Sequence, residues 1–439
     1  MSAAVILAGG KGTRLAERLG GQPKSLVDVA GKPLLERQID QLAKAGVDDI
    51  LLLVNYGADH IERFVASLNR SDVHVRLLDD GEPRGTAGAV LAALDRLPER
   101  FLVVYGDTLF NLDVERFVAR HIESQADATL FLHPNDHPQD SDIVEIDDDG
   151  WVRRFHPYPH PAGGFLPNLV NAAFYVIEKR ALEPYRDTTV PSDFGKNLFA
   201  AMLADGARIK GYASFEYIKD LGTPKRLEKV ERALRDGVVA RASLKTPQKA
   251  VFVDRDGTLN VWRGFITDPG QIELLPGVAE GIRLLNEREF RVIVTTNQPV
   301  IARGEASPDR LRQIHNKLET LLGQEGAFLD AIYFCPHHPD KGFAGEVAAL
   351  KIDCDCRKPG TGLVTRAAEA LHIDLSRSWM IGDTARDVLM ANRAGLRSVQ
   401  VKTGEPEYPA RGHDARPDFV CDDFAQAVAI ILDQPERAA

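Results

Sequence analysis

Short apolar segments alternate with amphipathic segments along the whole chain, and this alternation limits the fold more than any other feature. Residues 50–54 and 101–105 have the length and composition of buried strands, whereas residues 33–45 repeat Leu and Ile at helical spacing. Alternation of this kind predicts a mostly parallel sheet with helices on both faces. We therefore expect an α/β fold.

The alternation starts again after Pro247, which indicates more than one domain. A chain of 439 residues is long enough for two or three domains of roughly 100–200 residues each. The stretch 237–248 is polar and contains Gly237 and Pro247, a composition typical of linkers. We expect a first domain over residues 1–236, a linker over 237–248 and a second domain over 249–439.

Composition excludes several classes of function. A net charge of -10 without a Lys/Arg block argues against a nucleic-acid partner. The first residues lack the basic stretch of a secretory signal, and no run approaches the ~20 apolar residues of a membrane helix. We expect a cytoplasmic protein with small-molecule partners. The sequence allows a homo-oligomer but contains nothing that specifies one.

The sequence Asp-Arg-Asp-Gly-Thr-Leu at residues 254–259 directly follows an apolar strand. Open α/β sheets bind ligands at the carboxyl ends of their strands, so two carboxylates two residues apart can both face one site there. Asp254 would attack phosphorus and form an aspartyl phosphate. Asp256 would protonate the leaving oxygen and later activate water. Taken alone, this stretch is also compatible with a solvated acidic turn.

Three further groups of polar residues favour the catalytic interpretation. Thr296 and Asn297 end the next strand, and the sequence Arg-Lys-Pro at 357–359 supplies cations that suit a phosphoryl group. The segment 382–387 ends another strand with the carboxylates of Asp383 and Asp387. Carboxylates from two strand ends can hold Mg²⁺, which would shield the nucleophile from the charge of the phosphate.

The order of these four elements resembles the haloacid dehalogenase superfamily of phosphatases. The resemblance implies a Rossmannoid domain, and residues 259–292 are too few to hold a large cap. It implies that Thr296 and Lys358 stabilise the transferring phosphoryl group and that Asp387 orients Lys358. The implied Mg²⁺ ligands are Asp254, the main-chain carbonyl of Asp256, and Asp383. The expected substrate contacts are Asn297, Arg303 and Arg357.

A second constellation lies just before Lys358. Cys335 and His337 form one pair of ligands, and Cys354 and Cys356 form another, a set that suits tetrahedral Zn²⁺. The alternative is a coincidence of reduced thiols with a surface histidine. The arrangement resembles the branch that contains D,D-heptose 1,7-bisphosphate phosphatase and histidinol phosphatase. A departure from that branch is Pro299, which stands where a small residue is usual and leaves the substrate contacts open.

The first domain opens with a glycine-rich loop after its first strand. Gly9, Gly10 and Gly12 let main-chain N–H groups approach a phosphate or a base closely. The loop lacks the Gly-Lys-Ser/Thr ending of a Walker A motif, and Leu15 stands where a dinucleotide fingerprint has its third glycine. Further motifs follow along the chain: Pro-Lys-Ser-Leu at 23–26, Gly-Thr-Ala-Gly-Ala at 85–89, Gly-Asp at 106–107 and Asp-Leu-Gly-Thr-Pro at 220–224.

Together these motifs closely resemble the sugar-phosphate nucleotidyltransferases, whose fold is a glycosyltransferase-A-like α/β sandwich. The resemblance implies in-line attack of a sugar 1-phosphate on the α-phosphorus of a nucleoside triphosphate. Arg14 would neutralise the triphosphate, and Lys24 would hold the phosphate at the reacting centre. The implied Mg²⁺ ligands are Asp107 and Asp220. The implied nucleotide and sugar contacts are Gly9, Gly10, Gly85, Gly88 and Asn171.

Several residues of this assignment also have non-catalytic interpretations, and one segment differs from the usual pattern of the family. Arg14 and Lys24 are also compatible with ordinary surface cations, and Asp220 with a partner of its neighbour Lys219. Residues 155–160, Phe-His-Pro-Tyr-Pro-His, stand where many members carry a Glu-Lys pair for the sugar. The identity of the sugar therefore stays open.

The fusion itself suggests a two-step sequence, because removing one phosphate from a sugar bisphosphate can leave the sugar 1-phosphate that a nucleotidyltransferase uses. The resemblance to the heptose branch leads to the hypothesis of a phosphatase for D-glycero-D-manno-heptose 1,7-bisphosphate joined to a guanylyltransferase-like domain using GTP. Alternatives are a mannose- or glucose-1-phosphate nucleotidyltransferase, a histidinol phosphatase-like second domain, a regulatory first domain that binds without turnover, and a phosphatase acting on nucleic-acid ends.

Overall fold

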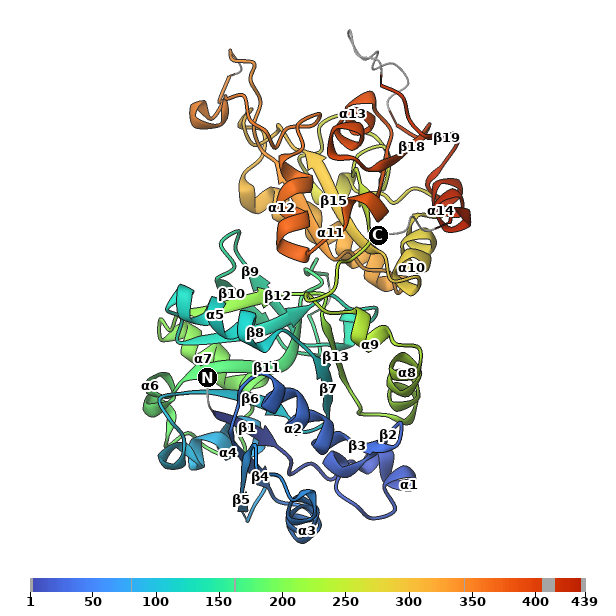
Figure 1. The fold of residues 1–439 in the computed structure, drawn as a ribbon. Helices are drawn as coiled ribbons and strands as arrows, with labels where there is room; N and C mark the ends of the chain where they lie inside the picture. The colour runs from blue at the N-terminus through green and yellow to red at the C-terminus, as the bar shows by residue number, and fades with distance from the viewer. Residues whose placement is uncertain (1–2, 80, 162, 343, 405–414, 436–439) are drawn as a thin grey trace. The chain divides into compact units, whose positions relative to one another are not determined.

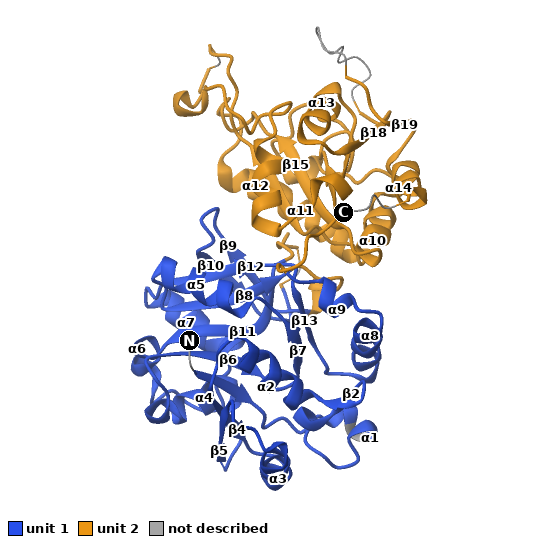
Figure 2. Ribbon diagram, in the orientation of Figure 1, with its two compact units in different colours: residues 1–133, 141–160, 169–243 blue, residues 134–140, 161–168, 244–439 orange. Residues whose placement is uncertain are grey.

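The computed structural model describes residues 3–79, 81–161, 163–342, 344–404 and 415–435 (Figure 1). None of the helices formed by these residues has the length and apolar character needed to cross a membrane. The chain divides into two compact units (Figure 2). Unit 1 comprises residues 1–133, 141–160 and 169–243, and unit 2 comprises residues 134–140, 161–168 and 244–439. The last division falls inside the stretch 237–248, where a short helix, α9 (Val238–Arg241), also forms.

A nine-stranded mixed sheet forms the centre of unit 1 (Figure 1). Strand β1 (Ala3–Leu7) pairs in parallel with β4 (Asp49–Val54) and β6 (Arg100–Tyr105), whereas β6 pairs antiparallel with β11 (Val170–Glu178). The main order is β10-β9-β11-β6-β1-β4-β5, and β8 and β12 branch from β11. The other strands of this sheet are β5 (His74–Asp79), β8 (Ala128–His133), β9 (Ile143–Ile146), β10 (Val152–His156) and β12 (Ile209–Ala213).

The sheet of unit 1 is covered on both faces. Val5 and Ile6 are adjacent in β1 and belong to two different hydrophobic cores, because successive side chains of a strand point to opposite faces. Helices α4 and α7 contribute to the first core, and α2, α3 and α5 to the second. The helices of this unit are α1 (Ala16–Leu19), α2 (Leu34–Lys44), α3 (Ala58–Leu68), α4 (Gly85–Ala92), α5 (Val114–Ser124), α6 (Lys179–Leu182), α7 (Phe199–Ala204), α8 (Pro224–Arg235) and α9.

Two small ladders complete unit 1 and bring distant motifs together. Strands β2 (Asp28–Val29) and β3 (Lys32–Pro33) pair with each other. Strand β7 (Thr108–Asn111), which follows the Gly-Asp motif, pairs antiparallel with β13 (Tyr217–Asp220), which ends in the Asp-Leu-Gly motif. The sheet is more mixed than the alternation predicts, since short connections such as the one from β9 to β10 are long enough only for antiparallel pairing.

Unit 2 has a six-stranded parallel sheet in the order β16-β15-β14-β17-β18-β19. Helices α10, α11 and α14 share one hydrophobic core with the sheet, and α12 and α13 pack against strands outside that core. The strands are β14 (Ala250–Val253), β15 (Arg291–Asn297), β16 (Ala331–Cys335), β17 (Trp379–Gly382), β18 (Arg397–Val401) and β19 (Phe419–Cys421). The helices are α10 (Val278–Glu287), α11 (Pro308–Gln324), α12 (Gly362–Leu371), α13 (Ala385–Ala394) and α14 (Phe424–Asp433).

Local signals in the sequence of unit 2 predict its element boundaries closely. Ser307 caps α11 by accepting a hydrogen bond from the main-chain N–H of Arg310, and Pro308 occupies the first helical position. Gly395 ends α13 in the left-handed conformation, which glycine adopts without strain. The connection from β14 to α10, all of which the structure describes, holds one 3-10 turn (Pro269–Gln271) and no cap domain.

Candidate functional sites

A cavity of about 560 Å³ lies in unit 1 at the carboxyl ends of β1 and β6. The glycine-rich loop after β1 forms one wall, and the start of α4 forms another. The lining includes six residues predicted from the sequence: Gly9, Gly10, Arg14, Lys24, Gly85 and Asp107. Motifs far apart in the chain therefore surround one space, whose volume suits a small-molecule ligand.

Glycines around this cavity permit close main-chain approach. Gly85 has φ +75, and a Cβ atom there would lie 2.4 Å from the main-chain oxygen of Ser192. Gly88 does not line the cavity; a Cβ there would lie 2.9 Å from Val190 Cγ1. Gly85 thus shapes the cavity wall, while Gly88 lets α4 pack against the segment around residue 190.

The two carboxylates expected to bind Mg²⁺ lie at the ends of neighbouring strands. Asp220 ends β13 opposite Thr108, and the main-chain N–H of Leu221 donates to the carbonyl of Asp107 at 2.8 Å. Lys24 Nζ contacts Asp107 Oδ2 at 2.5 Å. Arg226 Nη1 contacts both oxygens of Asp220, at 2.9 and 2.7 Å. Two carboxylates suit Mg²⁺ as ligands, and in this structure a basic side chain holds each one.

Charge balance explains the ionisation of Asp220. Burial by itself would raise the pKa of this carboxyl, but the Arg226 guanidinium and the N–H of Gly222 lower the pKa below its ordinary value. Arg226, in the first turn of α8, contacts this carboxylate. Asp220 therefore remains an anion near neutral pH.

Asn171 lies on β11 beside a local irregularity. The pairing of β11 with β8 shifts between Asn171 and Tyr175, and Ala173 has φ +57. Bulges of this kind re-aim side chains next to functional sites. Asn171 is not among the residues that line the cavity. Its Nδ2 atom and Asp142 Oδ2 both lie close to Gly195: a Cβ atom added to that glycine would be 3.2 Å from Nδ2 and 3.1 Å from Oδ2.

Sequence reasoning missed an anchored acidic residue in the same cavity. Asp193 Oδ1 accepts hydrogen bonds from the main-chain N–H and the hydroxyl of Thr86, each at 3.1 Å. Tyr105 donates to the Thr86 hydroxyl at 3.0 Å, and all three residues line the cavity. Thr86 belongs to a motif visible in the sequence, whereas Asp193 is remote in sequence and has no local signal.

In unit 2, β14 lies between β15 and β17, so the polar residues that follow these three strands meet at one edge of the sheet. Lys358 Nζ lies 2.7 Å from Asp254 Oδ1 and 2.6 Å from Asp387 Oδ1. The Lys358 side chain is 3% exposed. Asp387 also accepts from the main-chain N–H of Thr384 at 3.1 Å, which closes the first turn of α13.

Burial and charge set the ionisation of this centre. Burial raises the pKa of Asp254 to about 6, although Lys358 opposes the shift. Burial would lower the pKa of Lys358, but the two carboxylates raise it above its ordinary value. For Asp256, burial would raise the pKa, and the Arg255 guanidinium together with two side-chain amides lowers it instead. The pKa values of the two carboxyls are thus shifted in opposite directions by their surroundings.

A cavity of about 330 Å³ opens onto these carboxylates. Thr296, Asn297 and Arg357 line it, as do Asp254, Asp256, Lys358 and Asp383. Asn297 also exchanges hydrogen bonds with the main chain of Lys358, at 3.0 and 3.2 Å. A residue predicted to contact substrate therefore also fixes the backbone that presents the lysine.

Arg303 is placed differently from the other predicted contacts. It does not line the cavity; its guanidinium lies 4.6 Å from the centre of the Phe265 ring, and Phe265 does line the cavity. Sequence reasoning missed Trp262, His338 and Arg386, which also line the cavity. The only signal in the sequence for two of them is their position next to a predicted residue: His338 follows His337, and Arg386 precedes Asp387.

The acidic cluster fits a divalent cation. Carboxylate oxygens of Asp254, Asp383 and Asp387 lie within 4.8 Å of one another. Burial raises the pKa of Asp383 to about 8, and the nearby charges of Asp254 and Asp387 add to this shift. A cation would relieve this crowding. Because Lys358 and Thr384 already occupy Asp387, the carboxylates best suited to Mg²⁺ are those of Asp254 and Asp383.

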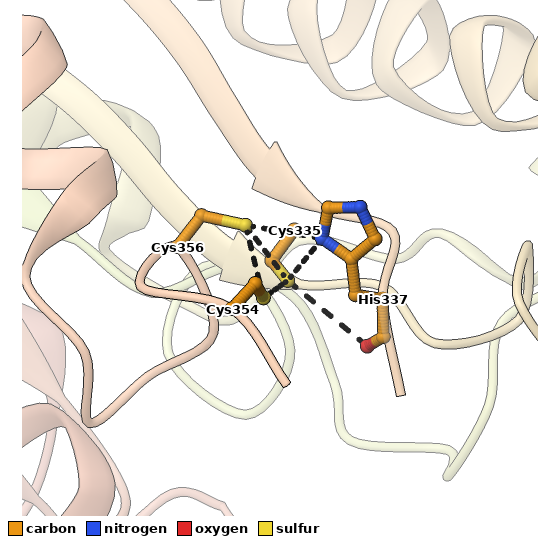
Figure 3. Close-up of side chains that lie close together, drawn as sticks. All are labelled: Cys335, His337, Cys354 and Cys356. Carbon is orange, nitrogen blue, oxygen red and sulfur yellow. Dashed lines mark hydrogen bonds between the residues drawn. The ribbon is translucent and has the colours of Figure 1, made fainter. Parts of the chain in front are cut away.

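The three cysteines and the histidine predicted to bind Zn²⁺ converge (Figure 3). Cys356 Sγ lies 3.3 Å from the sulfurs of Cys335 and Cys354 and 3.3 Å from His337 Nδ1. Ligands about 2.3 Å from a tetrahedral ion would be about 3.8 Å apart, so the four atoms need to move outward by only about half an ångström. The thiols are free. Cys335 ends β16 and Cys356 directly precedes Arg357, so a bound ion would brace the loop of Lys358.

Comparisons with known proteins divide the chain in the same way. The nucleotidyl transferase family model matches residues 3–237, and the HAD-hydrolase-like model matches residues 355–427. The D-glycero-D-manno-heptose-1,7-bisphosphate 7-phosphatase of Thermosynechococcus vestitus is 39% identical over 188 residues, which are 42% of this chain and 94% of that protein.

Two crystal structures cover the two halves. HddC from Yersinia pseudotuberculosis is 28% identical, covers 53% of this chain and 100% of its own, and has a TM-score of 0.46. The D,D-heptose 1,7-bisphosphate phosphatase of B. bronchiseptica, complexed with magnesium and phosphate, is 32% identical, covers 42% of this chain and 98% of its own, and has a TM-score of 0.38.

The N-terminal match covers more than half of the chain, and the C-terminal match covers nearly all of a relative that is 39% identical. Both halves are enzyme domains. The chain belongs to the nucleotidyl transferase family, and its C-terminal half belongs to the HAD-like family of D-glycero-D-manno-heptose-1,7-bisphosphate 7-phosphatases.

Proposed function

We propose that the protein is a bifunctional enzyme of heptose metabolism. Unit 2 removes the 7-phosphate of D-glycero-D-manno-heptose 1,7-bisphosphate. Unit 1 then transfers GMP from GTP to the heptose 1-phosphate, giving GDP-heptose and pyrophosphate. The observation that carries the proposal is the similarity of the C-terminal half to a heptose-1,7-bisphosphate 7-phosphatase over 94% of that relative's length.

Phosphate removal uses two carboxylates in turn. Asp254 attacks phosphorus while Asp256 gives a proton to the sugar oxygen that leaves. Water then attacks the aspartyl phosphate, and Asp256 takes a proton from it. Thr296 and Lys358 lie at the same cavity and stabilise the charge on the phosphoryl oxygens.

Nucleotidyl transfer needs no covalent intermediate. The sugar 1-phosphate attacks the α-phosphorus in line, and pyrophosphate leaves. Arg14 and Lys24 line the cavity and offset the charge of the triphosphate, while the glycine-rich loop and Gly85 approach the nucleotide closely. Catalysis in this unit therefore consists of positioning and charge stabilisation.

Two kinds of metal support these reactions. Asp254, Asp383 and the carbonyl of Asp256 would hold Mg²⁺ in unit 2, and Asp107 and Asp220 would hold it in unit 1, where it would supply positive charge at the reacting phosphates. Cys335, His337, Cys354 and Cys356 would hold a structural Zn²⁺. Lys24 and Arg226 must release Asp107 and Asp220 for the metal of unit 1 to bind.

The order of the two steps follows from the chemistry of the substrates. A bisphosphate that loses the phosphate remote from C1 keeps its anomeric phosphate, which is the nucleophile of nucleotidyl transfer. The first product is therefore the second substrate. Guanine as the base and heptose as the sugar rest on this pathway argument together with the family of the C-terminal half.

The test is a substrate panel on the full chain with phosphate and pyrophosphate measured separately. Wild-type protein is expected to release one phosphate from heptose 1,7-bisphosphate and, with GTP added, one pyrophosphate. Asp254→Asn should abolish phosphate release and retain pyrophosphate release from supplied sugar 1-phosphate and GTP. Asp107→Ala should have the reverse effect.

The competing assignments predict other outcomes of the same panel. Faster release of phosphate from histidinol phosphate than from the heptose ester would overturn the phosphatase assignment. Faster turnover of mannose 1-phosphate or glucose 1-phosphate would overturn the choice of sugar. Loss of both activities in either single variant would contradict two independent sites.

A further inference from the structure

We infer that Arg255 is a positioning residue for phosphate-ester hydrolysis, which orients the Asp256 carboxylate for proton transfer together with Gln298. Arg255 is the residue between the two catalytic aspartates, and its side chain reaches the cavity chemistry only through Asp256. The inference rests on the phosphatase activity proposed above but is independent of which sugar the enzyme accepts.

The contact between Arg255 and Asp256 is a two-point one. Arg255 Nε donates to Asp256 Oδ1 at 3.0 Å, and Nη2 donates to Oδ2 at 2.7 Å. Paired contacts of this geometry fix the plane of a carboxylate as well as its position. The Arg255 side chain is fully buried, whereas the Asp256 side chain is 19% exposed and lines the cavity. The arginine therefore supports the acid from behind.

Gln298 makes the support rigid. Its Oε1 accepts from Arg255 Nη2 at 2.9 Å, and its Nε2 donates to Asp256 Oδ2 at 2.9 Å and to Thr296 Oγ1 at 3.0 Å. Asn260 Nδ2 adds a contact to Asp256 Oδ1 at 3.2 Å. The end of β15 and the turn after β14 are thereby tied to one carboxylate.

The two buried cations of this site have separate partners. Lys358 contacts Asp254 and Asp387, whereas the ion pair described for Arg255 is with Asp256. A buried guanidinium without a counter-charge is strongly disfavoured, so Arg255 and Asp256 hold each other in place. The nucleophile and the acid–base group are thus positioned by different cations, which lets a substitution affect one without the other.

The chemical consequence concerns both half-reactions. In the first, the Asp254 oxygen bonds to phosphorus, the ester oxygen leaves, and Asp256 gives that oxygen the proton that it took from water in the preceding turnover. In the second, water bonds to phosphorus, the Asp254 oxygen leaves, and Asp256 takes a proton from the water. The neutral amides of Gln298 and Asn260 hold the carboxylate less strongly than the guanidinium does, so they yield to water or to the leaving oxygen while Arg255 stays in place.

The test compares two esters in pre-steady-state kinetics of the full chain, with substrate in excess over enzyme. The leaving group of phenyl phosphate, like a tyrosine side chain, has a pKa of about 10 and needs a proton donor. 4-Nitrophenyl phosphate releases a stabilised anion that does not. Arg255→Lys keeps the charge but not the two-point contact. It should slow the phenyl ester about 10- to 100-fold, part of the ~10²–10⁴ that general acid–base catalysis supplies.

With the nitrophenyl ester, the Arg255→Lys variant should show a burst of nitrophenolate followed by slow turnover, because hydrolysis of the aspartyl phosphate becomes limiting. The Asp256→Asn variant shows how much rate is lost when the proton-transfer group is removed altogether. The double variant Arg255→Lys/Asp256→Asn should be no slower than Asp256→Asn within about 2-fold, because residues that act as a unit are not additive.

A second buried arginine provides the matched control. Arg291 pairs with Asp330 and Gln248 at the start of β15, whereas Thr296 and Asn297, which line the cavity, end that strand. Arg291→Lys should leave the ratio of the two esters unchanged. If Arg255→Lys fails to fold, Gln298→Met tests the same point and should discriminate between the esters in the same direction.

Three results would overturn the inference. The first is that Arg255→Lys slows hydrolysis of both esters equally and shows no burst. The second is that the rate losses of Arg255→Lys and Asp256→Asn multiply in the double variant, and the third is that Gln298→Met and Arg255→Lys keep the wild-type ratio of rates for the two esters. If the protein hydrolyses the aryl esters but not heptose bisphosphate, the proposed substrate is wrong and the role of Arg255 is unaffected. Wild-type protein that hydrolyses neither aryl ester would overturn both.

Discussion

Replacing Lys358 with methionine tests how the charges of the phosphatase centre support the fold. The ammonium group lies 2.7 Å from Asp254 and 2.6 Å from Asp387, and its side chain is 3% exposed. Methionine fills nearly the same volume, so the substitution removes the charge and little packing. Two buried carboxylates would then face each other without a cation.

The size of the effect follows from the two ways in which the variant can respond. Breaking a buried pair by removing one partner costs about 3–5 kcal/mol. Asp254 can lower this cost by binding a proton, and at pH 7 that uptake costs about 1.4 kcal/mol, because the pKa of this carboxyl is already about 6 in the wild type. The two routes place the expected loss in the free energy of unfolding of unit 2 at pH 7 between about 1.5 and about 5 kcal/mol.

The sign of the pH dependence is also fixed. Without the lysine, the pKa of Asp254 in the folded state rises further above its value in the unfolded state. Stability is therefore lost as pH rises, and the difference between wild type and variant should shrink by about 1 kcal/mol between pH 7 and pH 5.5.

The assay is urea unfolding of the full chain in the presence of a chelator, followed by hydrogen exchange in peptides from β14 and β17. Lys402→Met is the matched control, because Lys402 contacts Asp422 at the same 2.7 Å with both side chains more than 60% exposed. It should cost less than about 1 kcal/mol at either pH. A loss below about 1.5 kcal/mol for Lys358→Met, or one that does not change with pH, would refute the reasoning.

Three further predictions concern the rest of the molecule. Elemental analysis should find about one zinc per chain, and Cys354→Ser should release it and destabilise unit 2; a variant that stays folded and active without zinc would contradict a structural site. Burial lowers the pKa of His315 to about 3, so this histidine lowers the free energy of unfolding as pH falls below about 6.5, by about 2 kcal/mol at pH 5. His315→Leu should remove this dependence on pH in urea unfolding, and an unchanged dependence would exclude His315 as its cause. Gly85→Ala should impair pyrophosphate release and destabilise unit 1 by at least about 2 kcal/mol more than Gly81→Ala. Both glycines have φ above +70, but only at Gly85 would an added Cβ atom meet other atoms. Equal effects of the two substitutions would show that the contact with residue 192 is unimportant.

Local signals account for what could be predicted. The caps of α11 and α13 depend on residues next to the helices, so Ser307 and Gly395 are readable without a structure. The motif loops follow apolar strands, and the carboxyl ends of parallel strands meet by topology, so the convergence of Asp254, Thr296 and Asp383 is also predictable. The four candidate zinc ligands form two short pairs and need only one close approach.

Other features depend on which remote residue fills a given contact, and spacing along the chain carries no information about that. Arg226 holds Asp220 from the first turn of α8. Asp193 reaches Thr86 across more than a hundred residues. Arg303 matches a motif but stacks on Phe265 instead of lining the cavity.

The sequence by itself therefore determined the two α/β domains, the reaction classes that their motifs resemble and most of the charged residues at each centre, because these depend on patterns within short segments. Only the tertiary structure decided how those charges are paired. Lys358 goes to the nucleophile and Arg255 to the acid–base carboxylate, because packing buries each cation beside one acid and a buried charge must have a partner.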